Sequence, residues 1–155
     1  MPSRRELIAM TQEEVRDYLR SQERLIVVSN GLGGFPHPVP MNFAIDDQDR
    51  PVILTFRKSQ KVLNLERDPR AALLVESGSA YHELKSVMIY AVAEIIGDAE
   101  GLEAARAAFA SKVHTEGLTA EAQGQSQASM VKRVAVRFTP QRTISWDHGK
   151  LGGRY

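Results

Sequence analysis

The feature that most constrains the fold is a succession of strand-like segments joined only by turn residues. Residues 24–30 (RLIVVSN) are apolar and β-branched, and a loop rich in glycine and proline follows them from Gly31. Residues 37–46 and 51–56 (PVILTF) are the next two strand-like segments, with DQDR between them. Connections this short join antiparallel neighbours, because parallel strands need a crossover of about a dozen residues or more. The sequence predicts a three-stranded meander here.

Further strand-like segments occupy the second half of the chain. Residues 70–77 (RAALLVES) form one, and residues 84–97 form a long apolar run that suits pairing on both sides. Residues 134–150 return to strand alternation, and the Thr139-Pro140 dipeptide predicts a turn that divides them into two strands. We therefore expect six or seven strands in all.

Helical periodicity is confined to three places. Thr11 and Glu14 have capping-box spacing and predict a helix over about residues 12–22. A short helix is expected after Ser59 as its cap, ending at Asp68-Pro69. Residues 99–131 are rich in alanine and glutamate, which predicts one firm helix and a looser second one. The tail, residues 150–155, has no period and is expected to be mobile.

This order of elements predicts the fold class. A doubly wound sheet would need helices between most strands, and they are missing. The glycines after residue 30 lack the G-x-G-x-x-G spacing of a dinucleotide-binding turn, and prolines stand where a helix would begin. With 155 residues, we expect one domain, a mainly β, antiparallel barrel with helical decoration.

Composition narrows the functional classes. A net charge of +1 gives no overall field for a nucleic-acid backbone. The chain has no cysteine, which excludes disulfides, thiolate metal sites and thiol catalysis. Neither a signal-peptide run nor a membrane-spanning run of apolar residues occurs, so we expect a cytoplasmic protein without membrane contact.

Basic and hydroxyl side chains gather in TFRKSQKVLNLERDP, residues 55–69. If a strand ends and a helix begins here, these side chains surround a helix N-terminus, where unpaired N–H groups favour phosphate. Charge runs are more often solvated surfaces, and on composition alone that interpretation is favoured.

The order of features in this segment resembles the flavin-phosphate segment of the pyridoxamine 5′-phosphate oxidase-like split β-barrels. That family has a strand, S-x-K, a short helix, N/D-P-R and another strand, and this chain has Ser59-Gln60-Lys61 and Asp68-Pro69-Arg70 in that order. The flavin/deazaflavin oxidoreductase branch of actinobacteria, many of whose members bind the deazaflavin coenzyme F420, is similar in more detail. The features shared with this branch are Arg57, Asn64-Leu65, PHPVPMNFAID and FTPQRTISWDHGKLGG.

The resemblance extends over roughly residues 12–150. It implies a split β-barrel of the FMN-binding type, a cofactor-binding site and a second subunit of the same chain as partner. It implies a homodimer with the cofactor at the subunit interface. The residues implied in phosphate binding come from one segment: Thr55, Arg57, Ser59, Gln60 and Lys61. Those implied to line the ring through their backbone are Pro40, Met41, Asn42 and Phe43. The chain departs from the family in SVMIYAVAE, which puts flavin contacts from Ser86 and Val87 in doubt and argues against vitamin B6 chemistry.

The implied activity is hydride transfer between F420 and an unidentified small molecule, which places the demanding chemistry on the cofactor. An FMN-dependent oxidoreductase and a non-enzymatic protein that binds or stores F420, flavin or haem are the alternatives. No catalytic residue is assigned. The four histidines, among them His37 and His82, have no metal-ligand spacing, so no metal site is expected. Adjacent Asp147 and His148 would point to opposite faces of a strand and are not expected to act together.

Overall fold

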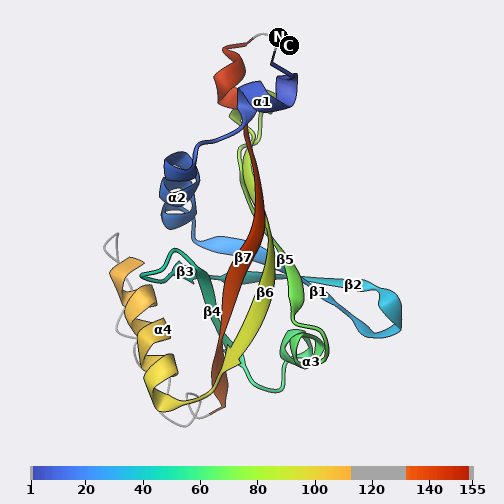
Figure 1. Ribbon diagram of the computed structural model, residues 1–155, viewed down its shortest axis with the longest axis vertical. Helices are drawn as coiled ribbons and strands as arrows, with labels where there is room; N and C mark the ends of the chain where they lie inside the picture. Colours follow the sequence, from blue (N-terminus) through green and yellow to red (C-terminus); the bar gives the residue numbers. More distant parts are fainter. Residues whose placement is uncertain (1, 113–131, 154–155) are drawn as a thin grey trace.

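The computed structural model describes residues 2–112 and 132–153 and is built on one seven-stranded antiparallel sheet (Figure 1). The strands are β1 (Arg24–Asn30), β2 (Pro36–Asn42), β3 (Ala44–Ile45), β4 (Pro51–Phe56), β5 (Arg70–Ser77), β6 (Lys85–Ile96) and β7 (Arg133–Asp147). The α-helices are α1 (Arg4–Ile8), α2 (Gln12–Ser21), α3 (Gln60–Arg67) and α4 (Ala99–Lys112). Short 3-10 turns are η1 (Leu32–Gly34), η2 (Tyr81–Glu83) and η3 (His148–Leu151).

The strand order explains why the sheet is curled. It runs β2-β1-β5-β6-β7-β4-β3, so β2 and β3 lie at opposite edges. Yet Asn42 ends β2 and Ala44 begins β3, and only Phe43 stands between them. Two residues along a chain span about 7 Å at most, so the two edges of the sheet must approach each other. The result is a mainly β, curled half-barrel, which confirms the predicted fold class.

Both hairpins of the predicted three-stranded meander form, since β1 pairs with β2 and β3 pairs with β4, but the single middle strand that should join them is wrong. β1 pairs with β2, but β4 pairs with β7 and β3, because the segment expected as one strand over residues 37–46 breaks at Phe43. Phe43 is 1% exposed and lies at the break, with its N–H donating to the Glu23 carbonyl at 3.2 Å. Burial of this ring in the core favours the break over a continuous strand.

The predicted turn at Thr139-Pro140 is also wrong, since β7 is one continuous strand. β7 pairs with β6 along its length, and the register shifts so that Tyr90 lies opposite Arg142 and Ala91 opposite Pro140. Gln141 is therefore the extra residue of a β-bulge. β4 pairs only with the first part of β7, up to Arg137. At Pro140 the edge of β7 away from β6 is therefore unpaired, and the missing N–H of proline costs no hydrogen bond to a strand on that side.

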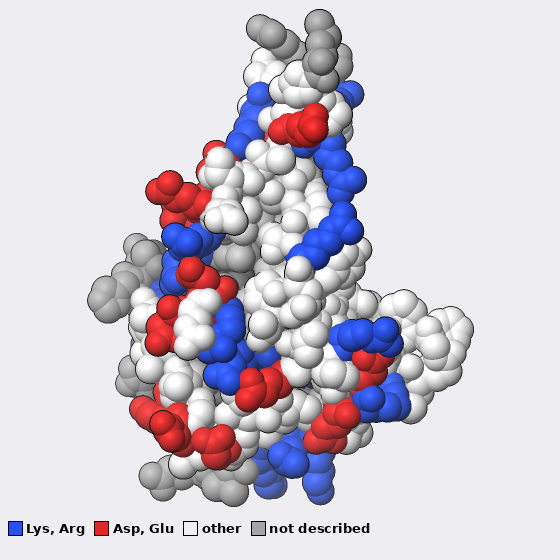
Figure 2. All heavy atoms as spheres, viewed as in Figure 1, with Lys and Arg blue, Asp and Glu red and all other residues white. Residues whose placement is uncertain are grey.

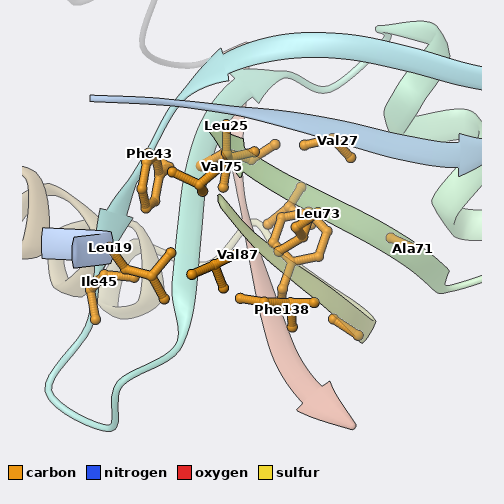
Figure 3. Packing of buried hydrophobic residues seen from close by; sticks show 14 of the residues in the cluster. Leu19, Leu25, Val27, Phe43, Ile45, Ala71, Leu73, Val75, Val87 and Phe138 are labelled. Atoms are coloured by element: carbon orange, nitrogen blue, oxygen red, sulfur yellow. The ribbon is translucent and has the colours of Figure 1, made fainter. Parts of the chain in front are cut away.

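The core fills the inside of the curl (Figure 3). Alternate residues of β1, β5 and β6 face inward, including Val27, Leu73 and Val87, which are at most 1% exposed. Phe138 of β7 packs among them, and α2 and α3 add side chains such as Leu19 and Val62. Inward-facing residues thus come from elements far apart in the sequence.

Three of the four α-helices lie where helices were expected, whereas α1, which Ser3 and Glu6 begin with a capping box, was not expected. Thr11 caps α2 with both bonds of a capping box, its side chain accepting from the Glu14 N–H. α3 ends at Arg67, directly before Asp68-Pro69. α4 matches the firm part of the expected helical insert, and the looser part, residues 113–131, lies outside the described residues, as do the last two tail residues. At the start of the tail, Lys150 Nζ donates to the Ala9 carbonyl at 2.8 Å.

Candidate phosphate-binding site

The end of β4 and the first turn of α3 bring three polar side chains together. Lys61 Nζ donates to Thr55 Oγ1 at 3.0 Å, and Thr55 Oγ1 lies 3.5 Å from Ser59 Oγ. Thr55 lies on the same side of β4 as the core residue Ile53, two positions earlier. We call Thr55, Ser59 and Lys61 the α3 cradle.

Ser59 stands at the N-cap position of α3, but its side chain makes no capping hydrogen bond. The expectation that its hydroxyl caps the helix is therefore wrong, because that hydroxyl lies beside Thr55 instead. The Val62 and Leu63 N–H groups both donate to the Ser59 carbonyl. Gln60 and Lys61 precede these bonds, so their N–H groups have no acceptor within the helix. The N-terminus of α3 thus has the donors and the partial positive charge that attract an anion.

Lys61 is a buried cation. Its residue is 8% exposed, and burial lowers the pKa of its ammonium. Among the described residues, no carboxylate forms an ion pair with it. A charge removed from water without a counter-ion is unfavourable, and an anion beside it would restore both the charge balance and the ordinary pKa.

Polar side chains also connect α3 to β1. Asn64 is completely buried and donates through Nδ2 to Ser29 Oγ of β1 at 3.1 Å. Its Oδ1 accepts from Gln60 Nε2 at 2.9 Å and from Arg67 Nη2 at 3.4 Å. Sequence reasoning assigned no role to Ser29 or Asn64. A polar residue at a position expected to face inward could have identified both. Ser29 alternates with Leu25 and Val27 along β1, and Asn64 lies on the apolar face of α3.

Among the described residues, the Arg57 side chain forms no hydrogen bond with the α3 cradle. Its side chain is 61% exposed, and Nη2 lies 3.9 Å from Glu66 Oε1, which is a long ion pair. Its backbone N–H donates to the Lys132 carbonyl at 2.9 Å. Lys58 is exposed in the turn before α3. Charges of both signs are mixed over the lower part of the molecule (Figure 2).

The four residues expected to line a ring occupy the end of β2 and the break after it. β2 is an edge strand, and Pro36, Pro38 and Pro40 alternate along it. Since proline has no N–H, these three residues take the non-hydrogen-bonded positions opposite β1, and their carbonyls face the free edge. Met41 is half-buried, Asn42 is exposed, and the carbonyl of Phe43 accepts from Lys112 Nζ at 2.6 Å.

The remaining candidates do not assemble into a catalytic group. Asp147 pairs with Lys85 at 2.9 Å, whereas His148 Nδ1 lies 3.0 Å from the Tyr81 carbonyl. His37 Nδ1 is buried without a hydrogen-bond partner among the described residues. Within residues 2–112 and 132–153, no three His, Asp or Glu side chains gather closely enough to hold a metal ion. None of the described helices is long and apolar enough to cross a membrane.

Comparison with known proteins decides the family. The sequence model of pyridoxamine 5′-phosphate oxidase matches residues 11–147, which include every element from α2 to β7. The chain belongs to the pyridoxamine 5′-phosphate oxidase family. The α3 cradle lies within the matched residues, at the strand-to-helix junction that carries Ser59-Gln60-Lys61. No protein with a curated description matches the chain.

Solved structures show the same fold. A conserved hypothetical protein of Mycobacterium tuberculosis is 35% identical, with a TM-score of 0.84 over 99% of this chain and 95% of that one. An FAD-binding protein of Mesorhizobium loti is 17% identical, with a TM-score of 0.67 over 88% of this chain and 94% of that one. The haem storage protein HutZ of Vibrio cholerae is 16% identical, with a TM-score of 0.65 over 89% and 97%. The last two proteins share this fold and bind different cofactors by their own descriptions.

Proposed function

We propose that this protein binds a flavin-type cofactor by its phosphate, with the α3 cradle as the anion site. The observation that carries the proposal is Lys61, a buried ammonium with no carboxylate partner among the described residues. It stands in the first turn of α3, where unpaired N–H groups add to the positive potential. A phosphate would neutralise Lys61 and accept hydrogen bonds from two nearby hydroxyls.

The individual residues then have distinct roles. Thr55 and Ser59 donate their hydroxyl protons to phosphate oxygens, and Lys61 supplies charge and a hydrogen bond. Gln60 orders the first turn through its bond to Asn64. Arg57 adds positive charge from the surface, because its long contact with Glu66 leaves the guanidinium solvated. The ring lies against the backbone of Pro40, Met41, Asn42 and Phe43.

Among flavin-type cofactors we propose F420 first, on the motifs shared with the deazaflavin-binding branch. When bound, it supplies two-electron hydride chemistry, so the protein need only orient the cofactor and a small-molecule substrate and exclude water. FMN is the alternative cofactor. A protein that binds or stores a cofactor without turnover is the alternative class, and the haem storage protein of the same fold makes it a specific candidate.

We further propose that the protein is a homodimer formed through the outer face of the sheet. The register places apolar residues in a row across five strands, namely Pro40, Ile26, Leu74, Met88 and Ile144. The next row adds Pro38, Val28, Ala72 and Tyr90, of which Tyr90 is 43% exposed. We call these two rows the outer apolar face. A continuous apolar surface of this kind is typical of protein–protein contacts.

The proposal that a second copy of this chain covers the outer apolar face rests on the position of Pro40. It belongs to the outer apolar face and also to the segment assigned to the ring, so a second copy seated on this face would lie beside the ring. Cofactor pockets often occur where two surfaces meet. The proposed cytoplasmic location fits a reducing environment for a chain without cysteine.

Titration with purified F420 and FMN, followed by the absorption and fluorescence of each cofactor, tests this proposal. We expect saturable binding of F420 at a ratio of one per chain and weaker binding of FMN. Tight binding of FMN with none of F420 would overturn the preferred cofactor, and binding of neither would overturn the anion site. Reoxidation of bound, reduced F420 by a panel of electron-poor small molecules separates an oxidoreductase from a storage protein.

A further inference from the structure

The inner face of β2 is less covered than that of its neighbour β1. Three residues of β2 alternate with its prolines and lie on the inner side of the sheet, namely His37, Val39 and Met41. Their partners in β1 are at most 2% exposed, whereas these three residues are half-buried. The core therefore covers β1 and leaves part of β2 open on the inside of the curl.

His37 lies at the point where β1 contacts α3. It pairs directly with Ser29 of β1, whose hydroxyl accepts from Asn64 Nδ2 of α3 at 3.1 Å. Residues that pair in this way have Cβ atoms about 5 Å apart. Asn64 also accepts from Gln60, which precedes Lys61 of the α3 cradle. His37 is thus close to α3, and it belongs to the strand that ends in the segment assigned to the ring.

The His37 imidazole forms no hydrogen bond with any residue that the structure describes. Of its two nitrogens, Nδ1 is completely buried, whereas Nε2 reaches the surface. A proton on Nδ1 would be a buried donor without an acceptor, which is unfavourable. The ring proton of the neutral imidazole therefore belongs on Nε2, which makes this nitrogen a donor that a ligand can reach.

We propose that His37 is a further cofactor-binding residue, with its Nε2–H donating to an oxygen of the cofactor's phosphate-bearing chain. The position beside α3 favours this chain over the ring as the acceptor. The inference rests on the flavin-type cofactor proposed above and adds a donor from β2 to those of the α3 cradle. Because F420 and FMN both carry such a chain, His37 contributes to the binding of either cofactor.

Calorimetric titration of F420 and of FMN into His37 variants tests the proposal. The amide of glutamine reaches about as far as Nε2 of histidine, and that of asparagine about as far as Nδ1. We expect His37→Gln to bind each cofactor within about threefold of the native protein, and His37→Asn and His37→Phe to bind about tenfold more weakly. His82→Phe, which changes an exposed histidine in η2, is the matched control and should bind normally.

The tautomer is measured separately, by ¹⁵N NMR of the cofactor-free protein at alkaline pH. We expect a proton on Nε2, none on Nδ1, and a shift of the Nε2 resonance when cofactor is added. A proton on Nδ1, or equal affinity of the native protein, His37→Asn and His37→Phe, would overturn this inference alone. Failure of the native protein to bind either cofactor would overturn the proposed function and this inference with it.

Discussion

Asn64 is a polar side chain with no exposure, and it holds α3 against β1 through Ser29. Replacing it by alanine should lower the free energy of unfolding by about 1–3 kcal/mol, because Ser29 and Gln60 each lose a buried partner. Urea denaturation measures the change. Asn42→Ala, at an exposed position, should cost less than about 0.5 kcal/mol, and equal costs for the two variants would contradict this role.

Lys112 is a half-buried lysine whose side chain contacts the break between β2 and β3. Its Nζ donates to the Phe43 carbonyl and lies 3.8 Å from the centre of the Phe43 ring. Burial lowers the pKa of Lys112 to about 8, from an ordinary value of 10.5. Between these values the unfolded chain binds the proton and the folded chain has lost it, so stability rises with pH.

This pH dependence gives a test that uses one substitution. The free energy of unfolding of the native protein should rise relative to that of Lys112→Met as the pH increases from about 8 to about 10.5. All other titrating groups are common to both proteins and cancel in the difference. A difference that stays constant or falls over this range would show that Lys112 is not desolvated.

Among the connections between elements, the turn from β5 to η2 depends on Gly78. Its φ is 98°, and an added Cβ would lie 2.3 Å from the Glu83 carbonyl oxygen, a backbone atom that cannot rotate away. Gly34 has a similar φ of 80° but open space around it. Gly34→Ala should therefore cost about 1–2 kcal/mol from backbone strain alone, and Gly78→Ala should cost distinctly more. Thermal unfolding compares the two, and equal losses would argue against the clash.

Features that are determined by residues close together in the sequence could be predicted, whereas features that depend on contacts with distant segments could not. The capping box of α2 and the Asp68-Pro69 end of α3 are set by neighbours within a few residues, and both were predicted. The break at Phe43 depends on core residues from other strands, and the unbroken β7 depends on pairing with β6, so both were missed. The cradle residues share one segment and were identified together, but the exposure of Arg57 could not be foreseen from that segment.

At the scale of the whole molecule, the outer apolar face predicts that two copies of the chain form a dimer. Leu74→Arg places a charge in the middle of this face, and desolvating it in a dimer would be unfavourable. Analytical ultracentrifugation should therefore show a dimer for the native chain and a monomer for Leu74→Arg. Gln48→Arg, in the exposed turn between β3 and β4, should remain dimeric. A native monomer, or a Leu74→Arg dimer of unchanged affinity, would contradict the proposed interface.

The two sides of β4 carry different groups. One side carries Thr55 of the α3 cradle, and the other carries Val52 and Leu54, which pack in the cluster beneath α4. A phosphate site at the α3 cradle does not follow from the fold class alone, since members of this fold bind different cofactors. Residue chemistry at the cradle therefore carries the functional argument.

Calorimetric titration of F420 into the native protein and into Lys61→Ala tests the central claim most directly. We predict that Lys61→Ala weakens binding by about 1.5–3 kcal/mol, roughly tenfold to a hundredfold, as expected for a lost hydrogen bond to a charged group. Lys58→Ala, which changes a neighbouring exposed lysine, should bind as the native protein does. Equal affinity of Lys61→Ala and the native protein would contradict the assignment of the α3 cradle as the phosphate site.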